Sequence, residues 1–294
     1  MIKYEMVKDK LEEILMDKRI SKIDGILVVT DEVGYKGDDQ VFPLHPENKF
    51  YLDQISDDKI RNAYVLEIGW GSGILSIGAI RKGAKEVVGL EINPRAKNYA
   101  GFNILLNGVE GRVSIRDGNQ EEIFSPVRGE KFDYIISNPP FEPTPNNIDY
   151  YIHSSGGSYG LDFVKKIFRE LNDYMTDRGH AQIVSFSPGN KAGPFMLKNL
   201  IKEYLPGKTN LIVERNPIRF NDFVERFVEI GKATSEQIKL MKERARQDKV
   251  SHLYLCMVHY EKGCNVLETV WCTKDYSNWD LPLNSKIPMG GRKK

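Results

Sequence analysis

Cysteine is scarce in this sequence. Its 294 residues include three cysteines, Cys256, Cys264 and Cys272, and none of them stands in C-x-x-C spacing. An odd number of cysteines cannot pair completely within one chain, which excludes a framework of fully bridged thiols and favours reduced thiols in a cytoplasmic protein. Because the cysteines and histidines show no metal-ligand spacing, we predict no metal site.

Long apolar runs and an excess of one charge are also missing. The N-terminal stretch "MIKYEMVKDKLEEIL" mixes charged and apolar residues, which argues against a signal peptide or a membrane span and predicts no membrane partner. The 42 basic and 41 acidic side chains give a formal net charge of +1. This balance provides no overall attraction to nucleic acids, although a local basic patch would still allow binding. Neither feature indicates an oligomeric state.

What the sequence does contain is a repeated alternation of apolar strands and helices. Strand patterns occur at "AYVLEIG", "EVVGLEI", "RVSIRDG" and "FDYIISNP", and helical patterns at "GILSIGAIRKG" and "PRAKNYAGFNILLNG" separate the first three. Strands that are apolar on both faces, with helices between them, are typical of a parallel sheet covered on both sides. We therefore predict a doubly wound α/β fold with a mostly parallel, seven-stranded sheet.

Two segments fall outside this alternation. Residues 1–50 predict an N-terminal extension, with a helix over residues 2–18 and a strand at "GILVVT", ahead of a main domain over residues 51–294. Residues 217–249 carry two charged helical patterns between the last two strands. They predict a helical insertion before the last core strand, "SHLYLCMVHYEKG".

A glycine-rich loop, "LEIGWGSG", follows the first strand of the alternation. In a doubly wound sheet, ligands bind beyond the carboxyl ends of the strands, and the first such loop is the usual site. Gly69, Gly71 and Gly73 would let the backbone approach a ligand closely. The dinucleotide fingerprint G-x-G-x-x-G would require glycine at position 74, where this chain has Ile74, so the spacing argues against a dinucleotide.

Three carboxylates stand at the ends of three successive strands. Glu67 suits the ammonium group of an amino acid, and Glu91, 24 residues later, is placed to hold both hydroxyls of a ribose. Asp117 ends the next strand and could accept a hydrogen bond from an adenine amino group. An adenosine that carries an amino acid has all three features. The pattern therefore predicts S-adenosylmethionine as the cofactor.

With these residues assembled, the chain resembles a class I S-adenosylmethionine-dependent methyltransferase. The stretch "VLEIGWGSG" is similar to the first motif of that superfamily. The resemblance as a whole covers about residues 40–215 and the last core strand. The stretch "NPPF" resembles the (N/D)PP(Y/F) motif of enzymes that methylate amide and amino nitrogens. The closest resemblance is to the HemK/PrmC-type glutamine methyltransferases.

Two further stretches support that branch. "FPLHPEN" is similar to a proline-containing family motif, in which Pro46 and Glu47 match while His45 and Asn48 replace the usual arginine and threonine. "GGSYGL" resembles a GG-x-x-GL segment of the same family.

These arguments together define the expected site. The expected cofactor-binding residues are Glu67, Gly69, Gly71, Gly73, Glu91, Asn93, Asp117, Gly118 and Asn138. The expected catalytic residues are Asn138, Pro139, Pro140 and Phe141. The methyl acceptor is expected to contact Pro46 and Phe141.

The motif "NPPF" suits transfer to a flat, weakly nucleophilic nitrogen. The Asn138 side-chain oxygen and the Pro139 carbonyl can each accept one N–H of the target NH₂ group, while Phe141 stacks on its face. Two prolines stiffen the loop that presents these acceptors. Because the methyl group of a sulfonium needs no strong base for its transfer, orientation supplies much of the rate.

Several acceptors remain open from the sequence. The simplest is a glutamine side chain in a protein or peptide partner; an exocyclic amino group of a base in RNA or DNA, and a small molecule or natural-product peptide, are alternatives. A binding module that has lost catalysis is a further alternative, against which the retained glycines and Asn138 argue. The insertion could be a packed helical pair, or it could overhang the strand ends and select the substrate. Its aromatic residues at helical spacing are Phe220, Phe223 and Phe227.

Overall fold

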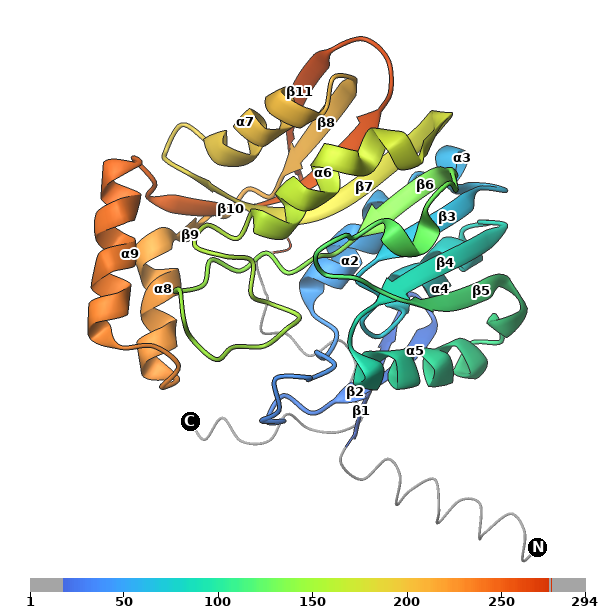
Figure 1. Ribbon diagram of the computed structural model, residues 1–294, viewed down its shortest axis with the longest axis horizontal. Coiled ribbons are helices and arrows are strands. Elements are labelled where there is room, and N and C mark those ends of the chain that lie inside the picture. Colours follow the sequence, from blue (N-terminus) through green and yellow to red (C-terminus); the bar gives the residue numbers. More distant parts are fainter. Residues whose placement is uncertain (1–17, 275, 277–294) are drawn as a thin grey trace, which may run out of the picture.

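The computed structural model describes residues 18–274 and residue 276, and Figure 1 shows the arrangement of their helices and strands. The helix expected over residues 2–18 lies outside the described residues except for Lys18, which begins a strand. Within the described residues, no helix is both long and apolar enough to cross a membrane.

The described strands form a two-stranded hairpin and one large sheet. In chain order they are β1 (Lys18–Ile23), β2 (Ile26–Asp31), β3 (Tyr64–Ile68), β4 (Glu86–Glu91), β5 (Val113–Asp117), β6 (Phe132–Ser137), β7 (Met175–Gly189), β8 (Lys208–Val213), β9 (Ile218–Arg219), β10 (His252–Glu261) and β11 (Val266–Trp271). The order across the large sheet is β11-β8-β10-β7-β6-β3-β4-β5, and β9 pairs with β10 beside this path.

The helices lie on both faces of that sheet (Figure 1). They are α2 (Pro46–Gln54), α3 (Asp57–Ile60), α4 (Ile74–Arg81), α5 (Pro94–Leu106), α6 (Asp162–Tyr174), α7 (Phe195–Tyr204), α8 (Phe220–Glu229) and α9 (Ser235–Gln247), with 3₁₀ turns η1 (Glu110–Arg112) and η2 (Ser125–Val127). The strands are apolar at successive positions because both faces of the sheet are covered. Val65 and Leu66 are both fully buried, but each belongs to a different one of the two hydrophobic clusters, which lie on opposite faces. The doubly wound α/β fold is thus confirmed.

The sheet is wider than the seven strands expected from the sequence. Among the described residues it has nine strands, because β9 and β11 join it at one side. β11 pairs in parallel with β8, whereas β10 runs antiparallel to both β7 and β8, so the sheet remains mostly parallel. In β11 ("VLETVW") exposed and half-buried residues alternate over Val266–Thr269 and the last two residues are exposed, as expected of an edge strand.

Strand order reverses between β3 and β6, which lie side by side at the centre of the sheet. β4 and β5 extend it on one side of this pair, and β7 extends it on the other. The register pairs Ile68 with Ser137, so both strands end at the same level. The glycine loop after β3 and the "NPPF" loop after β6 are therefore neighbours at the switch point, where ligands of such sheets bind.

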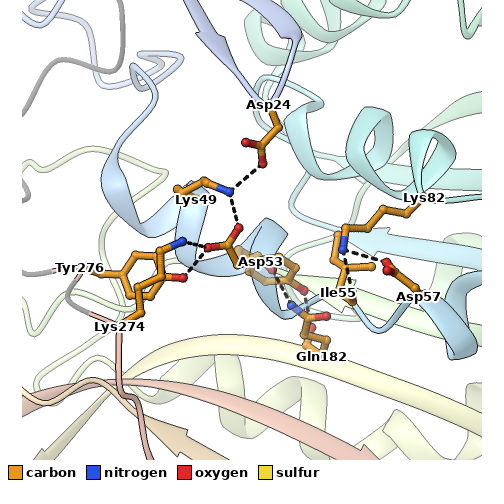
Figure 2. A network of polar contacts seen from close by, with 10 residues as sticks. Asp24, Lys49, Asp53, Ile55, Asp57, Lys82, Gln182, Lys274 and Tyr276 are labelled. Atoms are coloured by element: carbon orange, nitrogen blue, oxygen red, sulfur yellow. Dashed lines mark hydrogen bonds and ion pairs between the residues drawn. The ribbon is translucent and has the colours of Figure 1, made fainter.

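Helix α2 is tied to several distant segments by the polar network in Figure 2. Lys49 donates to Asp24 of the hairpin turn at 2.9 Å and also pairs with Asp53 one turn along α2. Asp53 in turn accepts hydrogen bonds from Lys274 and from the Tyr276 hydroxyl near the end of the described chain. These contacts fix the position of α2 relative to the hairpin and the sheet.

Candidate functional site

The glycine loop needs glycine for its backbone conformation. Gly69, Gly71 and Gly73 have φ values of 74°, 53° and 79°, in the left-handed region that residues with a side chain seldom adopt. The Gly69 N–H donates to the carbonyl of Leu90 in the neighbouring strand β4 at 3.0 Å, and the Gly73 N–H donates to the carbonyl of Trp70 at 2.9 Å, which closes a tight turn after β3. The resulting turn leads into α4 directly after Gly73.

Glu67, in β3, is a fully buried carboxylate beside this loop. It accepts a hydrogen bond from the Ser76 hydroxyl of α4, and that hydroxyl accepts one from the Trp70 indole N–H at 2.6 Å. Burial raises the pKa of Glu67 to about 8, although the hydrogen bonds from Ser76 oppose the shift. A buried acid with this pKa is ready to ionise when a cation binds next to it.

Glu91 ends β4 with both carboxylate oxygens directed at backbone N–H groups. Gly71 donates to Oε2 at 2.7 Å and Asn93 donates to Oε1 at 2.8 Å. Burial raises the pKa of Glu91, and these backbone hydrogen bonds oppose that effect. Each carboxylate oxygen can accept a further hydrogen bond, so the geometry suits two neighbouring hydroxyl groups.

Asn93 has a structural role that the sequence did not indicate. Its side-chain oxygen accepts the Arg95 N–H at 2.9 Å as the N-cap of α5. Its amide nitrogen donates to the carbonyl of Asp39 at 2.8 Å and so ties the loop before α2 to the end of β4. Both ends of the Asn93 amide are therefore already engaged.

A cavity of about 410 Å³ opens above these strand ends. The predicted site residues that line it are Glu67, Gly69, Gly71, Glu91, Asn93, Gly118, Asn138, Pro139, Pro140 and Phe141. Three predicted residues are not part of the lining: Pro46, Gly73 and Asp117. Asp117 instead pairs with Lys97, and its side chain is 86% exposed. The neighbouring Gly118 and Asn119 border the cavity at this position.

The "NPPF" loop begins at a tightly held backbone. The Ser137 hydroxyl donates to the carbonyl of Ile68 at 2.8 Å, and the Ser137 N–H donates to the Tyr51 hydroxyl of α2 at 3.0 Å. The next residue, Asn138, donates its side-chain N–H to Glu47 Oε1 at 2.9 Å. Phe141 is buried and packs edge-on against Phe186, with 5.0 Å between the ring centroids.

Several lining residues received no role from the sequence. Glu47 was noted only as a motif match, yet it contacts Asn138 directly. Glu142 follows the motif and accepts a hydrogen bond from the Tyr150 hydroxyl at 2.8 Å. His153 also lines the cavity, and burial lowers its pKa to about 4. Proximity to "NPPF" could have indicated Glu142, but Tyr150 and His153 lie in a loop without a motif.

Sequence comparison identifies the family of this chain. Over 155 residues it is 39% identical to a putative protein N5-glutamine methyltransferase of Methanocaldococcus jannaschii, an alignment that covers 49% of this chain and 75% of the relative. The chain belongs to the HemK/PrmC-type family of N5-glutamine methyltransferases. It is an enzyme of the methyltransferase class, as the motifs in its cavity predicted.

Other matches to this methyltransferase are shorter or more distant. It is 30% identical over 166 residues to the release factor glutamine methyltransferase of Aquifex aeolicus. That alignment covers 53% of this chain and only 54% of that enzyme. The family model for ribosomal protein L11 methyltransferase (PrmA) matches residues 44–139. A solved methyltransferase structure from Agrobacterium tumefaciens shares the fold, with a TM-score of 0.53, 14% identity and coverage of 84% of this chain and 71% of that one.

Proposed function

We propose that this methyltransferase transfers a methyl group from S-adenosylmethionine to the side-chain amide nitrogen of a glutamine in a protein. One observation carries the proposal: Asn138 and the carboxylates Glu67 and Glu91 line the same cavity. An acceptor held by the first can therefore meet a cofactor held by the other two. The names of the relatives, which act on protein glutamine, support the choice of acceptor.

The residues on the cofactor side fit S-adenosylmethionine. Glu91 would accept hydrogen bonds from the two ribose hydroxyls with the lone pairs that the backbone N–H groups leave available. Glu67 would face the ammonium group, and Gly71 leaves room for the cofactor because nothing lies within 4 Å of where its Cβ would be. Since Asp117 lies outside the cavity, we assign the adenine contact to the backbone of the neighbouring segment, residues 118–120.

On the acceptor side, the enzyme's task is orientation. When bound, the cofactor supplies an electrophilic methyl group on a sulfonium. The Asn138 side-chain oxygen and the Pro139 carbonyl would each accept one N–H of the glutamine amide, which turns the nitrogen lone pair toward that methyl group. Transfer would form the new N–C bond as the C–S bond breaks with its electron pair left on sulfur, and the nitrogen would lose one proton to solvent.

The proposal is tested by following labelled methyl groups. The purified chain is incubated with radiolabelled S-adenosylmethionine in three separate reactions. The added acceptor is a purified release factor, the soluble proteins of a cell extract, or the RNA of that extract. We expect label in protein, and we expect peptide mass spectrometry to locate the added methyl on a glutamine. Label that enters RNA, or only small molecules, would contradict the proposed acceptor and favour one of the alternatives left open by the sequence.

A further inference from the structure

Asn138 can serve as an acceptor of N–H groups only if its side-chain amide has the right orientation. The two ends of an amide are chemically opposite, since the oxygen accepts hydrogen bonds and the nitrogen donates them. If the amide were flipped, its NH₂ would face the NH₂ of a bound glutamine, and two donors would oppose each other. Some neighbour of Asn138 must therefore distinguish its two ends.

The contact between Asn138 and Glu47 makes this distinction. Asn138 Nδ2 lies 2.9 Å from Glu47 Oε1, and an ionised carboxylate can only accept. We propose that Glu47 is a positioning residue that holds the Asn138 amide with its oxygen available to the methyl acceptor. The inference rests on the proposed function, because it assigns Glu47 a role in orienting the same acceptor amide.

Glu47 is held on a rigid support. It lies in the first turn of α2, directly after Pro46, and Asn48 completes this turn by accepting the His45 N–H at 2.8 Å. Further along α2, the Tyr51 hydroxyl accepts the Ser137 N–H and donates to the carbonyl of Gln182 at 2.5 Å. One helix thus fixes the side chain of Asn138 through Glu47 and the preceding backbone through Tyr51. The network in Figure 2 anchors the same helix through Lys49 and Asp53.

The electrostatic surroundings of Glu47 bring its pKa close to neutral pH. Burial and the nearby Glu142 carboxyl raise the pKa of Glu47 to about 7, while the hydrogen bond from Asn138 opposes the shift. Burial also raises the pKa of Glu142, against the opposing effects of the Arg226 charge and the Tyr150 hydroxyl.

The basic groups near Glu47 leave this balance in place. His153 lines the same cavity, and its pKa of about 4 makes it neutral near pH 7. Lys49, two residues along α2, pairs with Asp24 and Asp53 instead. The N-terminal end of α2 favours the ionised form of Glu47. Glu47 and Glu142 are thus the acids that determine the charge beside Asn138.

A pH dependence of catalysis follows from this arrangement. Protonated Glu47 carries an O–H that can donate to the Asn138 oxygen, so it no longer excludes the flipped amide. At saturating cofactor, kcat should therefore rise as the pH increases through about 7 and level off above it, with a total change of about tenfold, the loss expected for a neutral side chain at position 47. The group responsible would be an acid that does not itself touch the acceptor.

The experiment compares Glu47→Gln and Glu47→Ala with the parent enzyme and with Glu110→Gln, which removes an exposed carboxylate outside the cavity lining. The kcat and KM for a purified release factor are measured from about pH 5.5 to pH 9, with the Kd for S-adenosylmethionine alongside. We expect Glu47→Gln to lose the pH dependence near pH 7 and about tenfold in kcat, and Glu47→Ala to lose about a hundredfold. The Kd should stay within about threefold, and Glu110→Gln should match the parent.

A second readout uses the protein alone. The side-chain NH₂ resonance of Asn138 is assigned by its absence in Asn138→Ala, and its chemical shift is followed against pH. It should titrate near pH 7 in the parent and not in Glu47→Gln. The positioning role is overturned if the Asn138 resonance titrates in Glu47→Gln as it does in the parent. It is also overturned if the kcat and its pH profile are unchanged in the Glu47 variants. Failure of the parent to methylate protein glutamine overturns the proposed function instead, and the NMR titration still decides the contact.

Discussion

Gly160 lies against the backbone of Phe141 so closely that a Cβ atom on it would come within 2.1 Å of the Phe141 carbonyl oxygen. The adjacent segment is hydrogen-bonded to the same loop, since the Gly156 N–H donates to the carbonyl of Glu142 at 3.0 Å. The glycine-rich segment "GGSYGL" therefore supports the "NPPF" loop from behind. The family resemblance had identified this segment without giving its purpose.

Substitution of Gly160 should damage methyl transfer more than cofactor binding. Gly160→Ala forces the Phe141 backbone to move, so we expect kcat to fall by about a hundredfold while the Kd for S-adenosylmethionine stays within about threefold. Gly129→Ala is the matched control, because its φ of 84° is similar but no atom lies within 4 Å of its Cβ position. If both variants lose the same activity, backbone strain rather than the clash with Phe141 is responsible.

Removal of the Asn138 side-chain amide should slow methyl transfer with little effect on cofactor binding. We expect Asn138→Ala to slow methyl transfer by on the order of a hundredfold, the usual scale for a positioned polar contact, and to change cofactor affinity only a few fold. Single-turnover rates and calorimetry measure the two effects. Equal turnover in the variant and the parent would remove Asn138 from the mechanism.

Cofactor binding should release a proton from Glu67. At pH 7 a carboxyl group whose pKa is about 8 is mostly protonated, and a bound ammonium group favours its ionised form. Affinity should therefore rise with pH up to about pH 8, and calorimetry in buffers of different ionisation enthalpy should detect close to one proton released. Glu67→Gln should abolish the proton release. Glu91→Gln should weaken cofactor binding but should still release the proton. Proton release that persists in Glu67→Gln would assign it to another group.

The helical pair α8 and α9 should influence the acceptor more than the cofactor. Phe227 of α8 packs edge-on against Tyr150, which lines the cavity, with 5.0 Å between ring centroids. We expect Phe227→Leu to raise the KM for the protein substrate several fold and to cost about 1–2 kcal/mol of stability. Phe168→Leu is the control, because Phe168 is equally buried but belongs to the cluster on the opposite face of the sheet. A similar KM effect in both variants would argue against an acceptor-binding role for α8.

The free energy of unfolding should fall in acid because of two neighbouring histidines, the buried His180 and the partly buried His259. Burial lowers the pKa of His180 to about 4 and that of His259 to about 3, and their rings are joined by a 3.0 Å contact. An unfolded histidine binds its proton near pH 6.5, so the unfolded state binds more protons between that value and about pH 4. Stability is then lost as the pH falls through this window. Urea unfolding should show a shallower pH slope in His259→Gln, and an unchanged slope would contradict the assignment.

The helical insertion shows where sequence reasoning stops. Helical spacing placed Phe220, Phe223 and Phe227 on one face, and the structure buries all three, which is the packed arrangement. Spacing could not show that Tyr150, from a loop with no motif, packs against Phe227. That contact depends on how two segments far apart in the sequence meet.

The sequence by itself determined the doubly wound fold and the positions of the strand ends, because apolar runs, glycine spacing and proline are local restrictions on the backbone. Only the tertiary structure decided which polar residues share the cavity. Asp117 ends a strand as expected, yet it is drawn to Lys97 at the surface. Glu47 lies 91 residues from Asn138 and meets it only because α2 packs beside the end of β6. A hydrogen bond requires atoms to lie within about 3 Å, and residue types along a chain do not specify distances between segments that fold together.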